Sequence, residues 1–504
     1  MALAAAMLLG PAGQAASPSP GIPGSDVLSS SGDAVGPITP MSEPEVVVEP
    51  TAPPEPQPEG PRWPLFADAE NKVGSGMLAV DDHDGIHIAY ADYVPLADGP
   101  RAHYAYCPAS AACGPGEGWI GTDLGEDVLG VMLATTSDGR PRLLIQQEGK
   151  VLEGGKDYHY AACDAACDLP DSWSTGYVTS TWGTEISDAF QSTRTRRAFA
   201  LDDQGNPGFV FYDRDYFHAE PDHLGGFYTW CEADCTEGTS AAPIWQEAYI
   251  GGGEPFDTDI YSLPALAYTS DGRPRMVVEV TTGEAGMARS GIIYKTCDED
   301  CERTSSWTHT RIAERGYESA VSWDLALDAN DQPHVAFYQG SLEDSGGNRL
   351  SHLTCSDTCD DPASWSSLDL GLGHGEGESP DIEIQLDGRP AISYLHSGGS
   401  AVHLARCVAD CSQPSGWRAT VLDTNTDLEN DFPVARPFTC DAGFWDAEST
   451  RLAFDSLGRM RTVYDAAYQA RCLYEDPERP DDPPYYQFHQ LRHAVRILIW
   501  DEAG

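Results

Sequence analysis

Paired cysteines followed shortly afterwards by a tryptophan recur six times along this chain. In five units the tryptophan lies six residues after the second cysteine, and in the unit that contains Trp245 it lies ten residues after. Two short apolar segments joined by a turn rich in Asp, Gly and Asn precede each pair. Seven segments carry this hairpin pattern, and they begin at Met77, Val131, Ala198, Ala265, Leu325, Ile382 and Arg451. A repeat of this kind constrains the fold more than any single motif.

Each unit, about 50 to 70 residues long, has room for four antiparallel strands, which is the pattern of propeller blades. The sequence therefore predicts an all-β fold, a seven-bladed β-propeller with four antiparallel strands per blade. The seventh unit has a third strand over residues 490–499 and no segment long enough for a fourth. Residues 62–66, which contain Trp63, resemble the missing strand. We expect this N-terminal strand to close the last blade and to remove the open sheet edge.

The tight turns expected in the hairpins require residues with positive φ. Glycine adopts this conformation without steric cost, and Asp or Asn precedes most of the glycines in question. The glycines predicted to fill these positions are Gly85, Gly139, Gly205, Gly272, Gly388 and Gly458.

The chain divides by composition into three parts. Residues 1–16 form an apolar run that ends in Gly13-Gln14-Ala15-Ala16, which indicates an export signal. Residues 17–60 are rich in Pro, Ser, Gly and Glu and predict a disordered linker, and residues 61–504 form the propeller. No later stretch approaches the roughly 20 apolar residues of a membrane span. We expect a protein that is secreted, held at the cell surface or periplasmic.

The cysteine pairs suit either a disulfide or half of a zinc site. Each pair stands alone in its repeat, without a second pair or a regular histidine partner, so disulfides are favoured. Cys440 and Cys472 are left over in the seventh unit and would span its first hairpin. The predicted disulfides are Cys107–Cys113, Cys163–Cys167, Cys231–Cys235, Cys297–Cys301, Cys355–Cys359, Cys407–Cys411 and Cys440–Cys472.

The formal net charge of -50 argues against nucleic acid and anionic membranes as partners. A cation or a basic partner is electrostatically favoured. The alternative is a solubility or salt adaptation spread over the whole surface. We expect a monomer that binds a glycan, an extracellular protein or a cation.

A propeller blade places its first-hairpin turn and its cysteine turn at one end of the ring, here called the hairpin rim. The other connections lie at the opposite end, here called the variable rim, and variable loops on a rigid scaffold are the usual place for a site. The candidate ligand-binding residues are Asp213, Asp215, His218, Glu220, Asp222 and His223 in one long loop, and Asp257, Asp259, Glu318, Glu376 and Glu378 in blade-to-blade loops. The alternative is that these are ordinary solvated acidic loops.

Calcium is the candidate cofactor, with Asp257, Asp259, Glu376 and Glu378 as ligands, because carboxylates around a channel favour cations. The basic run at residues 194–197 is expected to pair with the acids of the long loop. His103, His159, His403 and His493 occupy matching places in third strands and are expected to pack between strands.

The repeat of a hairpin, a cysteine pair and a tryptophan resembles those of secreted bacterial propellers of the broad sialidase-like and lectin-like group, although turns such as Ser137-Asp138-Gly139-Arg140-Pro141 depart from the sialidase pattern. The resemblance implies the fold, while the sialidase Asp box, Ser-x-Asp-x-Gly-x-x-Trp, is not matched. It leaves three functions: a non-catalytic binding or adhesion module, a glycoside hydrolase or lyase that uses channel carboxylates, and a structural surface protein. Several similar pockets between blades would favour binding, and one crowded cluster with shifted pKa values would favour an enzyme.

Overall fold

The computed structural model describes most of the chain beyond residue 61. The described ranges are 62–68, 72–94, 99–111, 113, 118–151, 155–181, 197–213, 225–250, 264–282, 289–315, 319–341, 348–373, 376–396, 399–434, 440–441, 443–474 and 485–500. The chain divides into two units, Met1–Glu55 and Pro56–Gly504, and all described residues belong to the second.

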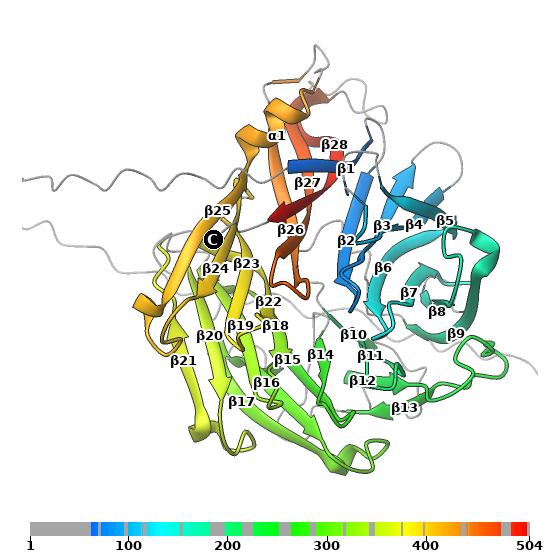
Figure 1. The fold of residues 1–504 in the computed structure, drawn as a ribbon, viewed down its shortest axis with the longest axis vertical. Coiled ribbons are helices and arrows are strands. Elements are labelled where there is room, and N and C mark those ends of the chain that lie inside the picture. Colours follow the sequence, from blue (N-terminus) through cyan, green and yellow to red (C-terminus); the bar gives the residue numbers. More distant parts are fainter. Residues whose placement is uncertain are drawn as a thin grey trace, which may run out of the picture. The chain divides into compact units, whose positions relative to one another are not determined.

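Seven four-stranded antiparallel sheets form the predicted seven-bladed β-propeller (Figure 1). Blade 1 contains β2 (Lys72–Val80), β3 (Ile86–Val94), β4 (Gly99–Cys107) and β5 (Ile120–Glu126). Blade 2 contains β6 (Val128–Thr135), β7 (Pro141–Glu148), β8 (Lys156–Cys163) and β9 (Trp173–Thr181). Blade 3 contains β10 (Phe199–Leu201), β11 (Pro207–Asp213), β12 (Gly225–Trp230) and β13 (Gln246–Tyr249). Blade 4 contains β14 (Ala265–Tyr268), β15 (Pro274–Thr282), β16 (Arg289–Cys297) and β17 (Trp307–Arg315). Blade 5 contains β18 (Ser319–Leu327), β19 (Pro333–Ser341), β20 (Arg349–Cys355) and β21 (Trp365–Asp369). Blade 6 contains β22 (Glu376–Ile384), β23 (Pro390–His396), β24 (Ala401–Cys407) and β25 (Trp417–Thr424).

The last blade joins the two ends of the propeller. It contains β26 (Phe444–Phe454), β27 (Met460–Tyr474) and β28 (Tyr485–Trp500), and β1 (Arg62–Asp68) pairs antiparallel with β28 as its outermost strand. The first strand of each blade contacts the first strand of the next, and β2 of blade 1 also contacts β26. The predicted N-terminal closure is therefore confirmed.

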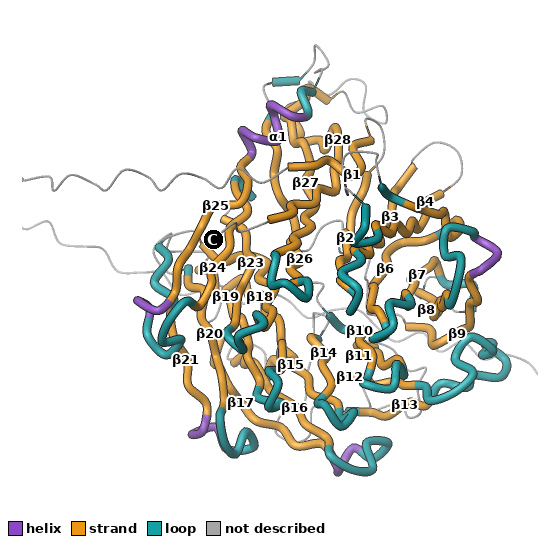
Figure 2. The backbone as a smooth tube through the Cα atoms, in the orientation of Figure 1, coloured by secondary structure: helices purple, strands orange, loops and turns teal. Residues whose placement is uncertain are grey.

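Short helices interrupt the strands, as the purple segments of Figure 2 show. One-turn 3-10 helices precede four outer strands, at Pro170–Ser172, Thr304–Ser306, Pro362–Ser364 and Pro414–Gly416. The connection from blade 6 to blade 7 forms the helix α1 (Asn425–Asp431), where the sequence analysis expects only a loop. Thr424 and Asp427 cap its first turn reciprocally, and Asp431 forms an ion pair with Arg496 at 2.7 Å.

Side-chain oxygens stabilise the hairpin turns from within. Asp81, Asp202, Asp328 and Asp455 each accept two backbone N–H groups of their own turn. The predicted glycines at 139, 205, 272, 388 and 458 have φ values between 74° and 83°. In blade 1 the prediction of Gly85 is wrong, because Asp84 holds the left-handed conformation at φ 63°. Its carboxylate accepts the backbone N–H of Ser456 in the blade 7 turn at 2.6 Å, which offsets the steric cost of that conformation.

All fourteen cysteines form the seven predicted disulfides. The tryptophan register has a direct explanation in the same turns. The indole N–H donates to the carbonyl of the second cysteine of its own unit, at 3.0 to 3.2 Å, in Trp173, Trp245, Trp307, Trp365 and Trp417. The disulfide and this hydrogen bond together fix the turn between the third and fourth strands.

The same tryptophans help to hold neighbouring blades together. Each packs against an aromatic side chain on the third strand of the preceding blade, with ring centroids 5.0 to 5.5 Å apart: Tyr104 with Trp173, Tyr160 with Trp245, Tyr228 with Trp307, Tyr294 with Trp365, and His352 with Trp417. Since a single sheet cannot bury both of its faces, these contacts make the core continuous from blade to blade.

Arg197 forms ion pairs that link blade 3 with blades 5 and 6. Its guanidinium lies 2.7 Å from Glu383, 3.1 Å from Asp381 and 3.7 Å from Asp324, all on the first strands of those blades. Asp381 also accepts the backbone N–H of Leu452 in blade 7 at 2.6 Å. The sequence analysis pairs this basic run with its neighbouring loop, but the described partners of Arg197 lie across the ring.

Candidate functional site

Most of the predicted site residues lie outside the described part of the chain. These are Asp215, His218, Glu220, Asp222, His223, Asp257, Asp259 and Glu318. Asp213 is described only as the last residue of β11. Their proposed binding roles stay predictions. Glu376 and Glu378 are described, and both lie in the first residues of β22, on the variable rim.

Glu376 lies beside polar side chains of its own blade. Its Oε2 is 3.2 Å from Nδ1 of His403, and its Oε1 is 3.9 Å from Nε2 of His396. The Tyr394 hydroxyl hydrogen-bonds to the same carboxyl group and lies 3.4 Å from Nδ1 of His403. Burial raises the pKa of Glu376, and it lowers the pKa of His403 to about 4. The surroundings therefore shift both groups toward their uncharged forms.

Glu378 connects this group of side chains to the two neighbouring blades. The Tyr338 hydroxyl of blade 5 donates to Oε1 of Glu378 at 3.2 Å. In blade 7, burial and, to a smaller extent, the negative charge of Glu378 together raise the pKa of Asp446 to about 6. Oδ2 of Asp446 accepts a hydrogen bond from Gln469 at 2.9 Å. Tyr338, Glu376, Glu378, Tyr394, His396, His403 and Asp446 are called the blade 5–7 cluster below.

An irregular start of β22 presents the two glutamates. The pairing of β22 with β23 shifts register between 376 and 378 and again between 378 and 381. Gly377 has a φ of 114°, and a Cβ atom there would lie 2.6 Å from Cβ of Leu350. Only glycine fits this position, since both the conformation and the space exclude a side chain. Such bulges re-aim side chains and are frequent beside active sites.

Gly399 brings the loop after His396 against blade 7. Its backbone N–H donates to the His396 carbonyl, and its own carbonyl accepts the backbone N–H of Ala447. A Cβ atom at this position would overlap Oδ1 of Asp446. The two short contacts explain how residues of different blades meet in one cluster.

The sequence analysis missed most of this cluster. It identified Glu376 and Glu378, and it placed His403 in blade packing, whereas His403 also contacts a carboxyl group. Tyr338 and Asp446 could not be identified from spacing, because they come from neighbouring blades and carry no repeated motif. The one sequence feature that could have indicated this cluster is Gly377, which lies between Glu376 and Glu378.

The metal prediction is tested only in part. Among the residues that the structure describes, no group of three or more His, Cys, Asp or Glu side chains is arranged to hold a metal ion. Two of the four predicted calcium ligands, Asp257 and Asp259, are outside those residues.

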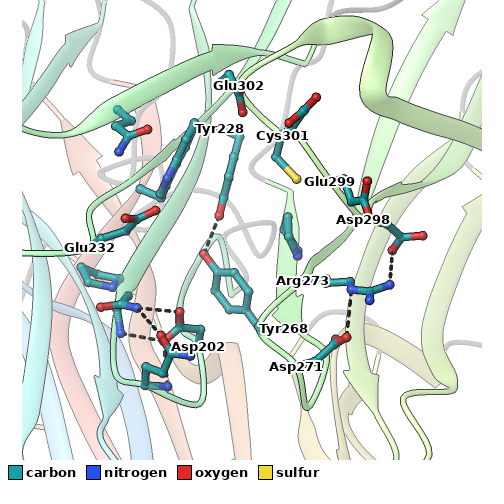
Figure 3. A pocket seen from close by; sticks show the side chains of 18 residues that line it. Asp202, Tyr228, Glu232, Tyr268, Asp271, Arg273, Asp298, Glu299, Cys301 and Glu302 are labelled. Atoms are coloured by element: carbon teal, nitrogen blue, oxygen red, sulfur yellow. Dashed lines mark hydrogen bonds and ion pairs between the residues drawn. The ribbon is translucent and has the colours of Figure 1, made fainter.

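A cavity of about 730 Å³ lies between blades 3 and 4 on the hairpin rim (Figure 3), away from the rim favoured by the sequence analysis. Tyr228 and Tyr268 meet in it, with their hydroxyl oxygens 2.8 Å apart. The Trp230 ring stacks on Tyr228, with centroids 5.1 Å apart. Among the described residues that line the cavity, one is basic, Arg273, and the acidic ones are Asp202, Glu232, Asp271, Asp298, Glu299, Asp300 and Glu302.

This cavity occurs where blade 3 departs from the repeat. The second residue of the second strand is an Arg or His in five blades: His87, Arg142, Arg275, His334 and Arg461. Blade 3 has Gly208 instead, and a Cβ atom there would overlap the hydroxyl of Tyr268. The longer cysteine turn before Trp245 belongs to the same blade. The absence of a side chain at this position leaves room for the tyrosine pair.

No family model and no curated protein matches the chain. Solved structures of similar fold include the polysaccharide lyase Uly1, with a TM-score of 0.46 and 10% identity, covering 89% of this chain and 94% of that one. A protein of unknown function from Dyadobacter fermentans has a TM-score of 0.44 and 10% identity, covering 88% and 99%. The α-L-arabinofuranosidase Arb93A from Fusarium graminearum has a TM-score of 0.41 and 10% identity, covering 68% and 94%.

Proposed function

We propose that this protein is an acid–base enzyme that cleaves glycosidic bonds at the blade 5–7 cluster. The observation that supports the proposal most is the raised pKa of two carboxyl groups, Glu376 and Asp446, beside a third carboxyl group and two imidazoles. Carboxyl groups with shifted pKa values are concentrated at functional sites, where acid–base chemistry offsets the cost of burying them.

The groups of the cluster suit distinct steps. Asp446, with a pKa of about 6, keeps a useful protonated fraction near neutral pH and can give a proton to a leaving sugar oxygen. Glu378, oriented by the Tyr338 hydroxyl, is available as base or nucleophile. Tyr394 and His403 position Glu376. Cleavage by water and cleavage by elimination both need such an acid and base.

The binding-module alternative predicts similar pockets in several blades. The cavity between blades 3 and 4 depends instead on Gly208, which replaces the Arg or His that five other blades carry. The predicted glycan-binding and adhesion role is therefore kept as the second candidate. Its test is a glycan array with the same variants.

The seven disulfides suit an oxidising compartment, and the predicted export of the chain fits a saccharide substrate outside the cell. A separate observation is that no helix among the described residues is long and apolar enough to cross a membrane.

The test is a panel of chromogenic glycosides and polysaccharides. New reducing ends would report hydrolysis, and the ultraviolet absorbance of an unsaturated product would report elimination. Asp446→Asn should lower the rate about 100-fold to 10,000-fold, as loss of a general acid does. Glu148→Gln is the matched control, an exposed glutamate on the same rim in blade 2. Unchanged activity in Asp446→Asn would refute the assignment.

A further inference from the structure

The cavity between blades 3 and 4 is on the opposite rim from the blade 5–7 cluster, and the proposed reaction does not use it. Its volume of about 730 Å³ is within the usual range of small-molecule sites. It is lined by aromatic, amide and acidic side chains, including Trp230, Gln246 and Glu232. The chemistry of a ligand can be inferred from each of these three kinds of group.

The paired tyrosines indicate an acceptor in the ligand. Burial raises the pKa values of Tyr228 and Tyr268, so both hydroxyls remain protonated. One hydroxyl donates to the other across 2.8 Å. Figure 3 shows the two hydroxyls pointing toward each other. Their hydrogen bond uses the proton of one hydroxyl, and the proton of the other can be donated to an oxygen of a ligand in the cavity.

Trp230 supplies an apolar surface beside these polar groups. Its ring is half-buried and nearly parallel to that of Tyr228, with an interplanar angle of 12°. Sugar rings present a face of C–H groups with hydroxyls around the edge. Such a face can lie on an aromatic ring while its hydroxyls reach the tyrosines and Gln246.

The charge of the lining selects among saccharides. The Asp202 carboxylate accepts hydrogen bonds from its own turn, and the Asp298 carboxylate accepts one from Arg275. Glu232 and Glu299 are exposed and have no ion pair or hydrogen bond among the described residues. An anionic sugar is repelled by this lining, whereas a protonated amine is attracted and can also lie against the aromatic rings.

We propose that the cavity between blades 3 and 4 binds an amine-bearing saccharide. The proposal is independent of the catalytic assignment, because the two sites share no residue. Binding should therefore be unchanged in Asp446→Asn, even if that variant loses activity or if the chain proves inactive.

The test uses isothermal titration calorimetry at fixed ionic strength and about pH 6, where the amine is protonated. The probes are a glucosamine tetramer, its N-acetylated counterpart and spermidine. The glucosamine tetramer should bind most tightly, because only it offers both the sugar ring and the charge. Equal binding of the acetylated tetramer, tighter binding of spermidine, or no binding of the tetramer would overturn the proposal.

Variants separate a built site from general surface charge. The double variant Glu232→Gln/Glu299→Gln should weaken glucosamine tetramer binding about five-fold, as expected for two exposed ion pairs. Tyr268→Phe should weaken tetramer binding and leave the weaker spermidine binding unchanged. Glu237→Gln is the matched control, because Glu237 is exposed on the same turn as Glu232 but does not line the cavity. An equal loss in the control would refute the site.

Discussion

Replacement of Arg197 by methionine tests whether ion pairs between distant blades stabilise the ring. The change keeps an unbranched side chain and removes the charge that lies within 4 Å of Asp324, Asp381 and Glu383. The two aspartates are fully buried, and the glutamate side chain is 28% exposed. Without the guanidinium, these carboxylates repel one another in a poorly hydrated region, so the variant should be less stable.

The size of the effect follows from the burial of the partners. Removing one member of a buried ion pair costs about 3 to 5 kcal/mol. The Arg197 side chain is 25% exposed, which favours the lower end, about 3 kcal/mol. A unit of this size has an unfolding entropy of about 0.9 kcal/mol/K, so Tm should fall by about 3 °C.

The assay is thermal unfolding followed by tryptophan fluorescence, in a cycle with Glu383→Gln. Neutralising Glu383 should stabilise the Arg197→Met variant and not the parent, since Glu383 has an ion-pair partner in Arg197 in the parent, whereas in the variant it only repels Asp324 and Asp381. Burial already raises the pKa of Glu383, and loss of Arg197 should raise it further. The defect should therefore shrink as pH falls, because the folded state then binds protons more readily than the unfolded chain. An unchanged Tm in Arg197→Met, or the same effect of Glu383→Gln in both backgrounds, would refute this reasoning.

Three further predictions address burial, closure and cation binding. Burial lowers the pKa of Lys295 to about 7, so the unfolded state binds the Lys295 proton more strongly than the folded state does. The free energy of unfolding should therefore rise by roughly 4 kcal/mol between about pH 7 and pH 10. Urea titrations of Lys295→Met over the same pH range should lack this rise. Deletion of residues 17–58 should leave Tm almost unchanged, whereas deletion of 17–66 removes most of β1 and should lower it sharply, and equal effects would contradict closure by β1. If the predicted calcium ligands bind, millimolar Ca²⁺ should raise Tm above NaCl at the same ionic strength, and a variant with all four ligands neutralised should lose the difference.

The fold could be predicted in detail because each unit repeats the same local chemistry. The Trp307 indole, for example, bonds the Cys301 carbonyl within its own turn, and so the spacing of the two residues reports a local structure. The closing strand could be predicted because the seventh unit lacks a fourth one. The helix α1 could not, since its capping pair, Thr424 and Asp427, lies in a connection that no other blade shares.

The candidate site could be predicted only where composition revealed it. Glu376 and Glu378 were identifiable as acids on a rim loop, but the shifted pKa of Asp446 depends on burial in the assembled ring. The partners of Arg197 lie more than 120 residues away in sequence, on strands that the repeat brings opposite to it. Contacts between distant blades leave no periodic signal, because each needs only one residue on either side.

Departures from the repeat are more informative than the repeat itself. Gly208 and Gly377 each occupy a position where a side chain would collide with a neighbouring residue, and each lies beside a group of polar side chains. Random loss of a side chain from the repeat would leave a packing defect. Beside Gly208, however, the Tyr268 hydroxyl occupies the space, and Gly377 lies in a bulge that presents two glutamates. The two proposed sites lie on opposite rims of one scaffold and share no residue, and impairing either should therefore leave the other intact.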